Sequence, residues 1–342
     1  EKNSFELAPA TIAGQKVSYI ILDDASDSTT AVSNTRKLMT EHKVDVVIGS
    51  SITPNSLAMA DVVADGDTPM ISLASSARIV EPMDAKRRWV FKTPQNDRLM
   101  AEALAEHMKK DKVKTLAYIG FNDALGEAFK AEVVKAAEAQ GIKVVAAESF
   151  NRTDTSVAAQ ALKILAASPA AVVVGAAGTP AALPQIELVK RGYKGRIYHN
   201  HGVANNDFLR VAGKDAEGAY VPVGPVLVVE QLSQGNPIKA VASDYVSRYE
   251  AKYGAGSRTL FGAYAWDAVL LLQRAIPEAL KTAKPGTVEF RRALRDALEQ
   301  TRNFPVTNGV VNMSEQDHSG LDRRARVMVR IDGGRWKVDS AD

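Results

Sequence analysis

The sequence contains no cysteine among its 342 residues. This absence excludes disulfide bonds, thiolate catalysis and cysteine-ligated metal sites. It fits an oxidising compartment, where a stray thiol is a liability, although some cytosolic proteins also lack cysteine. No apolar run approaches the roughly 20 residues that a transmembrane helix needs, so we expect a chain that does not span a membrane.

An excess of charge of either sign is also missing. The 43 basic and 40 acidic residues are spread along the chain and give a net charge of +3. No basic stripe with interleaved aromatic residues is present, so we expect no nucleic-acid partner. No signal peptide is visible, so a secreted protein with this sequence would already have lost it.

The motifs of common enzyme classes are absent as well. The sequence has no Gly-x-Ser-x-Gly elbow, no phosphate loop ending in Gly-Lys-Ser/Thr and no His-Glu-x-x-His. Gly175-Ala176-Ala177-Gly178 lacks the later acidic residue of a dinucleotide fingerprint. His199 and His201 are two residues apart, but the spacing offers no third metal ligand. We therefore expect no enzymatic activity, no metal and no cofactor.

What is present is a regular alternation of strand and helix patterns. Short apolar runs rich in β-branched residues predict strands at residues 17–22, 44–48, 69–73, 113–119, 142–147, 170–174, 196–198 and 326–331. Apolar residues at helical spacing predict helices at residues 30–41, 55–64, 98–109, 124–140, 156–167, 181–190, 238–253, 260–280 and 288–299. Short, continuously apolar strands between helices are typical of parallel sheets covered on both faces. The length suffices for two domains, and no low-complexity linker separates them, so we predict an α/β fold with two doubly wound lobes.

Several motifs occur in the order and spacing of a known family. They are Leu22-Asp23-Asp24-Ala25-Ser26-Asp27, Val44-Asp45-Val46-Val47-Ile48-Gly49, Pro69-Met70-Ile71-Ser72, Phe91-Lys92-Thr93-Pro94 and Asn122-Asp123-Ala124-Leu125-Gly126. Through their joint order the chain resembles the periplasmic leucine/isoleucine/valine-binding family, which feeds ABC importers. The resemblance covers almost the whole chain. The family usually has an apolar strand and helix before the Asp23-Asp24 strand, so we expect the first lobe to lack its first strand.

The resemblance implies the type I periplasmic binding protein fold, in which three crossovers join two lobes around a ligand cleft. We expect residues 1–94 and 225–322 in lobe 1, and residues 95–224 and 323–342 in lobe 2. The resemblance also implies a periplasmic or extracellular monomer that captures a small-molecule carboxylate and delivers it to the permease of an ABC importer. A sensory ligand-binding domain of the same fold is an alternative end use.

The first predicted ligand contacts follow two strands of lobe 1. Residues 49–54 end a strand and open a helix, where free N–H groups and the helix dipole favour an anion. By resemblance, the Ser51 backbone and the Thr53 hydroxyl hold the ligand carboxylate, and backbone and hydroxyl groups of Ala74 and Ser76 complete the anchor. The alternative interpretations are that Thr53 only caps the helix and that the second loop is an ordinary polar turn.

Three further predicted contacts lie in lobe 2. Leu125 stands where the family commonly has a tyrosine, and Ala177 lies in a turn where relatives often have aromatic groups, so a ligand bulkier than leucine fits. His201 stands where the family usually has an acid that holds the ligand's ammonium group. Histidine is neutral or cationic and cannot replace that acid, so we predict an aromatic or 2-oxo acid as the ligand. His201 satisfied within its own loop, a competing His199, or Asp207 as a substitute acid are the alternatives, and the last would allow a branched-chain amino acid.

Overall fold

The computed structural model describes residues 1–341. The chain divides into two compact units, of which unit 1 comprises Glu1–Asn96 and Ser233–Ala325. Unit 2 comprises Asp97–Leu232 and the described residues from Arg326 onward. The chain therefore crosses between the units after Asn96, Leu232 and Ala325. Within the described part of the chain, no helix has both the length and the apolar character needed to cross a membrane.

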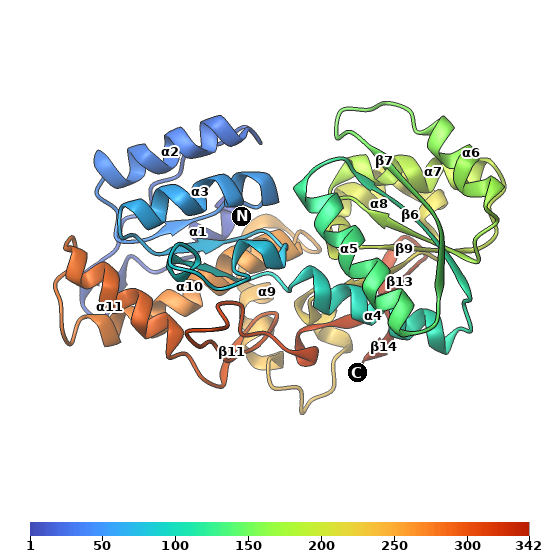
Figure 1. Ribbon diagram of the computed structural model, residues 1–342. Coiled ribbons are helices and arrows are strands. Elements are labelled where there is room, and N and C mark those ends of the chain that lie inside the picture. Colours follow the sequence, from blue (N-terminus) through green and yellow to red (C-terminus); the bar gives the residue numbers. More distant parts are fainter. Residues whose placement is uncertain (342) are drawn as a thin grey trace. The chain divides into compact units, whose positions relative to one another are not determined.

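Unit 1 is built on a three-stranded parallel sheet in the order β3-β4-β5. Its strands are β3 (Val47–Ile48), β4 (Met70–Ser72) and β5 (Val90–Lys92), with the short hairpins β1 (Thr11–Ile12)–β2 (Gln15–Lys16) and β11 (Phe304–Val306)–β12 (Gly309–Val311). Its helices are α1 (Lys2–Phe5), α2 (Ser28–Thr40), α3 (Thr53–Asp65), α9 (Lys239–Tyr253), α10 (Leu260–Ala279) and α11 (Val288–Glu299). Helix α2 lies beside α3, and α10 lies beside α11 (Figure 1). Buried side chains of the sheet and of α3, Val47, Met59, Val63, Met70 and Val90 among them, form its core.

The strand predicted at residues 17–22 is wrong. The segment follows the β1–β2 hairpin without the paired backbone of a strand, and Ile20 and Ile21 are 39% and 51% exposed. A strand needs a neighbour to satisfy its N–H and C=O groups. Among the described residues no strand pairs with the free edge of β3, so the apolar pattern alone does not produce sheet structure.

Unit 2 contains a seven-stranded sheet in the order β14-β13-β10-β9-β8-β6-β7. The strands are β6 (Thr115–Phe121), β7 (Lys143–Phe150), β8 (Ala171–Gly175), β9 (Arg196–His199), β10 (Tyr220–Val223), β13 (Val327–Asp332) and β14 (Arg335–Ala341). The helices are α4 (Asp97–Lys110), α5 (Ala124–Ala139), α6 (Ala158–Ala166), α7 (Ala182–Lys190) and α8 (Asn206–Ala212). Strands β6 to β10 are parallel, whereas β13 and β14 are antiparallel additions at one edge.

Helices cover both faces of the unit 2 sheet. Helices α4 and α5 pack together on one face, whereas α6, α7 and α8 form a second group (Figure 1), as right-handed crossovers in this strand order require. In the core beneath α4 and α5, the buried Tyr118 donates a hydrogen bond of 2.7 Å to the carbonyl of Gly126. A Cβ at Gly175 would lie 1.8 Å from the Tyr118 hydroxyl, so this ring contacts both the α5 start and the β8 end. The predicted α/β fold with parallel-dominated sheets is confirmed.

Candidate ligand-binding site

The loops that follow β3 and β4 are joined by buried serine hydroxyls. The Ser56 hydroxyl donates to the Ser50 carbonyl at 2.8 Å, and its oxygen lies 2.8 Å from that of Ser72. The Ser72 hydroxyl in turn accepts a hydrogen bond of 3.1 Å from the Ala74 N–H. Because β3 and β4 are parallel neighbours, both loops leave the same edge of the sheet. The two predicted carboxylate loops are therefore held next to each other.

Thr53 is the first residue of α3 and does not cap it. The cap position is Ile52, which provides no side-chain hydrogen bond. The Thr53 side chain is 1% exposed, and its hydroxyl finds no hydrogen-bond partner within residues 1–341. A buried hydroxyl without a partner is costly, and such groups are rare in folded proteins. This hydroxyl is therefore an unused donor at the start of α3.

Ser51 already contacts a carboxyl group of the chain itself. Burial raises the pKa of the Glu1 carboxyl to about 7, and a hydrogen bond from Ser51 acts in the opposite direction. A carboxyl group therefore lies beside Ser51, where burial and, to a lesser degree, the nearby Asp24 favour its protonated form.

Ala74 and Ser76 are both buried in the second loop. The Ala74 N–H is used by Ser72, which limits this residue to offering its carbonyl. Ser76 caps the short 3-10 helix η1 (Ala77–Ile79) by accepting a hydrogen bond of 3.3 Å from the Arg78 N–H. A serine that accepts through its oxygen retains its own O–H donor.

Asp24 is a neighbour of the first loop for which the sequence alone predicted no role. Its carboxylate accepts hydrogen bonds of 2.7 Å from the Ser50 hydroxyl and 2.9 Å from the Asn55 side chain. Asp24 belongs to the Leu22-Asp23-Asp24 motif, but nothing in the local sequence connects it to Ser50 and Asn55, which lie 26 and 31 positions further along the chain. An acid therefore stands beside the predicted anion loop.

In unit 2 the loops that carry Ala177 and His201 contact each other. The Gly178 N–H donates to the Gly202 carbonyl at 2.8 Å, and a Cβ at Gly202 would lie 2.7 Å from the Ala177 Cβ. Strands β8 and β9 are neighbours, and their carboxyl ends lead into these loops. Leu125, at the start of α5, is 7% exposed, and its N–H donates to the Asp123 carboxylate at 2.9 Å.

The two histidines of the β9 end lie in different surroundings. His199 is fully buried, its Nε2 lies 2.8 Å from the Gln185 amide oxygen, and its ring packs edge-on against Phe208. Burial lowers the pKa of His199 to about 3, so it is neutral at physiological pH. His201 opens the 3-10 helix η4 (His201–Val203) and is 4% exposed. Asp207 lies on the surface, 71% exposed, and pairs with Arg210 at 3.1 Å.

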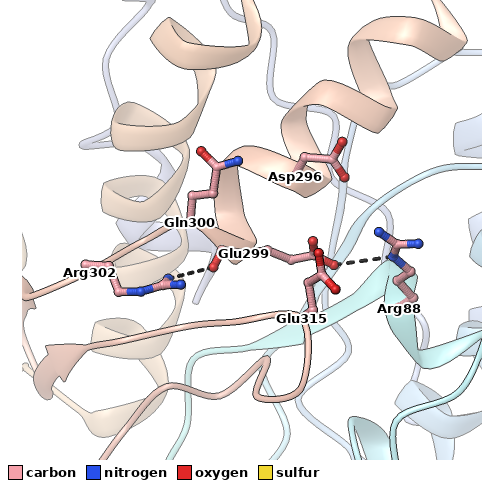
Figure 2. Close-up of a pocket in the computed structure, with 6 residues that line it drawn as sticks. All are labelled: Arg88, Asp296, Glu299, Gln300, Arg302 and Glu315. Atoms are coloured by element: carbon pink, nitrogen blue, oxygen red, sulfur yellow. Dashed lines mark hydrogen bonds and ion pairs between the residues drawn. The ribbon is translucent and has the colours of Figure 1, made fainter.

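A separate pocket of about 250 Å³ lies in unit 1 and contains none of the predicted contact residues. It is lined by Arg88, Asp296, Glu299, Gln300, Arg302 and Glu315 (Figure 2). One ion pair joins two of its lining side chains, Arg88 and Glu299. Glu299 lies 3.6 Å from Arg88 and 3.3 Å from His318, and Arg302 donates to the Glu299 carbonyl at 2.7 Å. This pocket gives no reason to move the candidate site away from the strand ends.

The geometry defines a class of protein. Two α/β units, each with loops at the carboxyl ends of parallel strands, are typical of proteins that bind small molecules at those loops. Among residues 1–341, no group of three histidine or acidic side chains is arranged to hold a metal ion. The chain belongs to the periplasmic binding protein family, whose sequence model matches residues 2–335.

Individual relatives agree with this membership. The leucine-, isoleucine-, valine-, threonine- and alanine-binding protein of Pseudomonas aeruginosa is 26% identical over 283 residues, which are 82% of this chain and 72% of that protein. A solved extracellular ligand-binding receptor from Rhodopseudomonas palustris HaA2 is 42% identical, with a TM-score of 0.95 over 99% of this chain and 94% of that one. A solute-binding protein of a Rhodopseudomonas palustris ABC transporter, solved in complex with benzoate, shares the fold at 19% identity, with a TM-score of 0.83 over 99% and 89% of the two chains. The predicted family is confirmed, and these relatives are named as binding proteins or as a ligand-binding receptor.

Proposed function

We propose that this chain is the solute-binding component of an ABC importer and captures a small carboxylate, an aromatic or 2-oxo acid, outside the cytoplasm. It performs no chemistry on the ligand. The ligand carboxylate accepts hydrogen bonds from Ser51, Thr53 and Ser76 of unit 1, and Ala74 lines the same site, because its N–H already donates to Ser72. The rest of the ligand contacts Leu125, Ala177 and His201 of unit 2. A ligand that contacts both units favours their closed arrangement over the open one. Hinge closure around a ligand is the established behaviour of periplasmic binding proteins as a class.

The buried hydroxyl of Thr53 is the observation that carries the proposal. It has no partner within residues 1–341, and it stands at the start of α3, where the helix dipole favours negative charge. A carboxylate there would accept a charge-assisted hydrogen bond, worth about 1.5–3 kcal/mol.

The ligand class follows from what His201 cannot do. An ammonium group buried in a closed site needs an anionic partner, which histidine does not provide. The neighbouring candidate, Asp207, is exposed and paired with Arg210, which argues against its use as a substitute. His201 can donate a hydrogen bond to a keto oxygen, a ring hydroxyl or a second carboxylate oxygen.

Size favours a ring or a similarly bulky group. Ala177 offers little side chain, and Leu125 provides an apolar surface. Burying a phenyl-sized group removes ~150–250 Å² from water, worth ~4–6 kcal/mol at ~25 cal/mol/Å². Because association costs at least ~4 kcal/mol, a small acid held by polar contacts alone would bind weakly. The benzoate complex of the structurally similar solute-binding protein shows that this fold can hold such an acid.

A branched-chain amino acid is the second candidate, and Asp24 is the observation that favours it. Its carboxylate lies beside the first loop and could pair with an ammonium group on the unit 1 side. The Pseudomonas aeruginosa relative is named for binding amino acids. Against this candidate, the Ser50 and Asn55 side chains that donate to Asp24 are neutral groups of unit 1 that already occupy the carboxylate.

Isothermal titration of the full chain distinguishes the two candidates. The ligands are leucine, alanine, benzoate, phenylpyruvate and 4-methyl-2-oxopentanoate. We expect at least one of the three acids to bind about tenfold or more tightly than leucine, the equivalent of about 1.4 kcal/mol. Tighter binding of leucine than of every acid would overturn the ligand assignment and favour the amino-acid alternative.

A single substitution gives the matched test. His201→Glu should weaken acid binding through charge repulsion and admit amino acids. Asp207→Asn, in the following helix, should leave the affinities for acids and for amino acids unchanged.

A deletion strain distinguishes a role in transport from a role in sensing. Loss of uptake without a change in transcription supports the importer, and the reverse pattern supports a sensory domain.

A further inference from the structure

Lys92 is a buried lysine at the end of the apolar strand β5. Its side chain is 0% exposed, although lysine is rarely fully buried. Its ammonium group donates hydrogen bonds to the Ser75 carbonyl at 2.7 Å, to the Asn96 side-chain oxygen at 2.8 Å and to the Gln95 carbonyl at 3.3 Å. One side chain thus joins the second predicted ligand loop to the last two residues of unit 1 before the first chain crossing.

The connection continues from Gln95 to the third crossing. The Gln95 amide donates to the carbonyl of Ala325 at 2.7 Å, and Ala325 is the last residue of unit 1 before the chain returns to unit 2. The Gln95 amide oxygen accepts from the Tyr264 hydroxyl at 2.9 Å, and the Tyr264 carbonyl accepts from the Thr93 hydroxyl at 2.9 Å. All of these groups are buried, so the hydrogen bonds do not exchange freely with water.

Strand register brings the ligand loop and this network together. Strands β4 and β5 are parallel neighbours, and Ser72 pairs with Lys92. The chain leaves β4 at Ser72 for the ligand loop and leaves β5 at Lys92 for the crossing. A rotation of the backbone at residues 93–96 would move two acceptors of Lys92, and a ligand that orders Ser75 and Ser76 would fix its third.

We propose that Lys92 is a positioning residue that couples ligand contact at the second loop to the backbone at the crossings after Asn96 and Ala325. This inference rests on the proposed function, because it takes residues 72–77 as part of the ligand site. Coupling of this kind is reciprocal, so a substitution that releases the crossings also weakens ligand binding. A ligand shifts the two arrangements only by the ratio of its affinities for them, so weaker coupling leaves an open fraction even when every molecule has bound ligand.

The absence of cysteine makes a direct test practical. Cysteines introduced at the exposed Lys37 in α2 and Lys163 in α6 carry spin labels, and pulsed spin resonance measures their distance distribution with and without saturating acid from the titration panel. The variants are Lys92→Met, which removes the donors, and Lys92→Arg, which retains them. Lys86→Met, which removes the same positive charge at an exposed position of unit 1, is the matched control.

In the parent chain and in the Lys86→Met control, we expect saturating acid to shift the whole spin-label distance distribution from that of the open state to that of the closed state. In Lys92→Met we expect affinity to fall about 10-fold and a substantial open fraction to persist at saturation, with Lys92→Arg restoring conversion. A purely structural role would lower affinity or thermal stability but leave the conversion complete at saturation, which overturns the coupling. If Lys92→Met does not fold, Gln95→Leu, which cuts the network beyond Lys92, must show the same incomplete conversion.

The outcomes separate this inference from the function beneath it. If the parent chain binds none of the acids, the proposed function and the coupling both fail. If the parent chain binds an acid and shifts fully to the closed distance distribution, and the Lys92 and Gln95 variants also shift fully, only the coupling fails.

Discussion

The two units position their candidate ligand loops by different physical means. In unit 1, buried serine hydroxyls connect the loops after β3 and β4, through Ser56 and Ser72. In unit 2, close packing holds the corresponding segments. The Tyr118 ring fills the space between α5 and β8, and Gly126 lies so close to the Phe121 carbonyl that a Cβ would be 1.9 Å from it.

This difference has a chemical consequence for each unit. Ser56 donates its O–H to the Ser50 carbonyl, so the O–H of Ser72 serves Ser56. The hydroxyls of the unit 1 loops that keep an O–H for an anion are those of Thr53 and Ser76. In unit 2 the Tyr118 hydroxyl and the Nε2 of His199 have internal partners, whereas the buried Nδ1 of His199 finds none within residues 1–341. Under the proposed function, unit 2 contributes apolar surface through Leu125 and Ala177 and a polar group through His201.

The largest expected effect concerns the neutral His199. Burial places its pKa at about 3 in the folded chain, below the ordinary ~6.5. The folded state then binds fewer protons than the unfolded state, so its contribution to stability is complete above pH ~6.5. It is lost as the pH falls toward 3, by about 1.4 kcal/mol per pH unit and about 4–5 kcal/mol in total.

Urea unfolding of the parent chain and of His199→Gln between pH 7 and pH 4 measures this contribution. Other groups titrate in both proteins, so the difference between the two curves is the relevant quantity. We expect the advantage of the parent chain to shrink as the pH falls. A difference that does not change with pH would show that His199 is not held neutral.

The close packing of unit 2 predicts the next largest effect. Gly126→Ala would force a methyl group against the Phe121 backbone, and the start of α5 would have to shift. We expect a loss of about 3 kcal/mol in the free energy of unfolding, at the upper end of overpacking costs. The control is Gly235→Ala, where no heavy atom lies within 4 Å of the added Cβ. Equal thermal unfolding midpoints for the two variants would contradict the proposed packing role.

The sequence predicted the elements far better than the contacts between them. Helix α11 was predicted with its observed bounds from apolar residues at helical spacing, and the structure shows Thr287 capping it by accepting a hydrogen bond from the Phe290 N–H. Strand β10 was missed because it is short and contains Pro222, which has no N–H to donate and is unfavourable within a sheet. Both outcomes follow from local chemistry.

The candidate site, in contrast, depends on contacts between elements, which the sequence did not predict. Sequence spacing could not separate His199 from His201, because burial by Gln185 and Phe208 depends on how α7 and α8 pack. Lys92 was visible only as part of the Phe91-Lys92-Thr93-Pro94 motif, and the strand β5 that carries it was not predicted. Its acceptors Ser75 and Asn96 depend on strand register, which the pattern of residues did not define.

The serine network of unit 1 predicts a moderate effect. Ser72→Ala removes the acceptor of the Ala74 N–H and the partner of Ser56. We expect a cost of about 1–2 kcal/mol in unfolding free energy, together with weaker acid binding. Ser168→Ala, an exposed serine in unit 2, should change neither quantity. Loss of stability without any loss of affinity would mean that the network supports the fold but does not position the ligand loops.

The smallest expected change in stability is an increase, and it concerns Thr53. Thr53→Val replaces a buried hydroxyl that has no partner in the described chain with a methyl group of similar size. Removing an unsatisfied buried donor should raise the free energy of unfolding by about 0.5–1 kcal/mol. If the hydroxyl binds the ligand carboxylate, affinity for the acid should nevertheless fall about tenfold or more, the equivalent of about 1.4 kcal/mol or more.

Thr35 is the matched control for this substitution. It is also a buried helical threonine of unit 1, but its hydroxyl donates to the Ala31 carbonyl at 2.8 Å. Thr35→Val should lower the free energy of unfolding by about 1 kcal/mol and leave the affinity for the acid unchanged. Thr53→Val, in contrast, should raise stability and weaken binding. If Thr53→Val also loses stability, its hydroxyl has an internal partner after all. If Thr53→Val gains stability but binds the acid as tightly as the parent chain, the hydroxyl is unsatisfied for a reason other than the ligand.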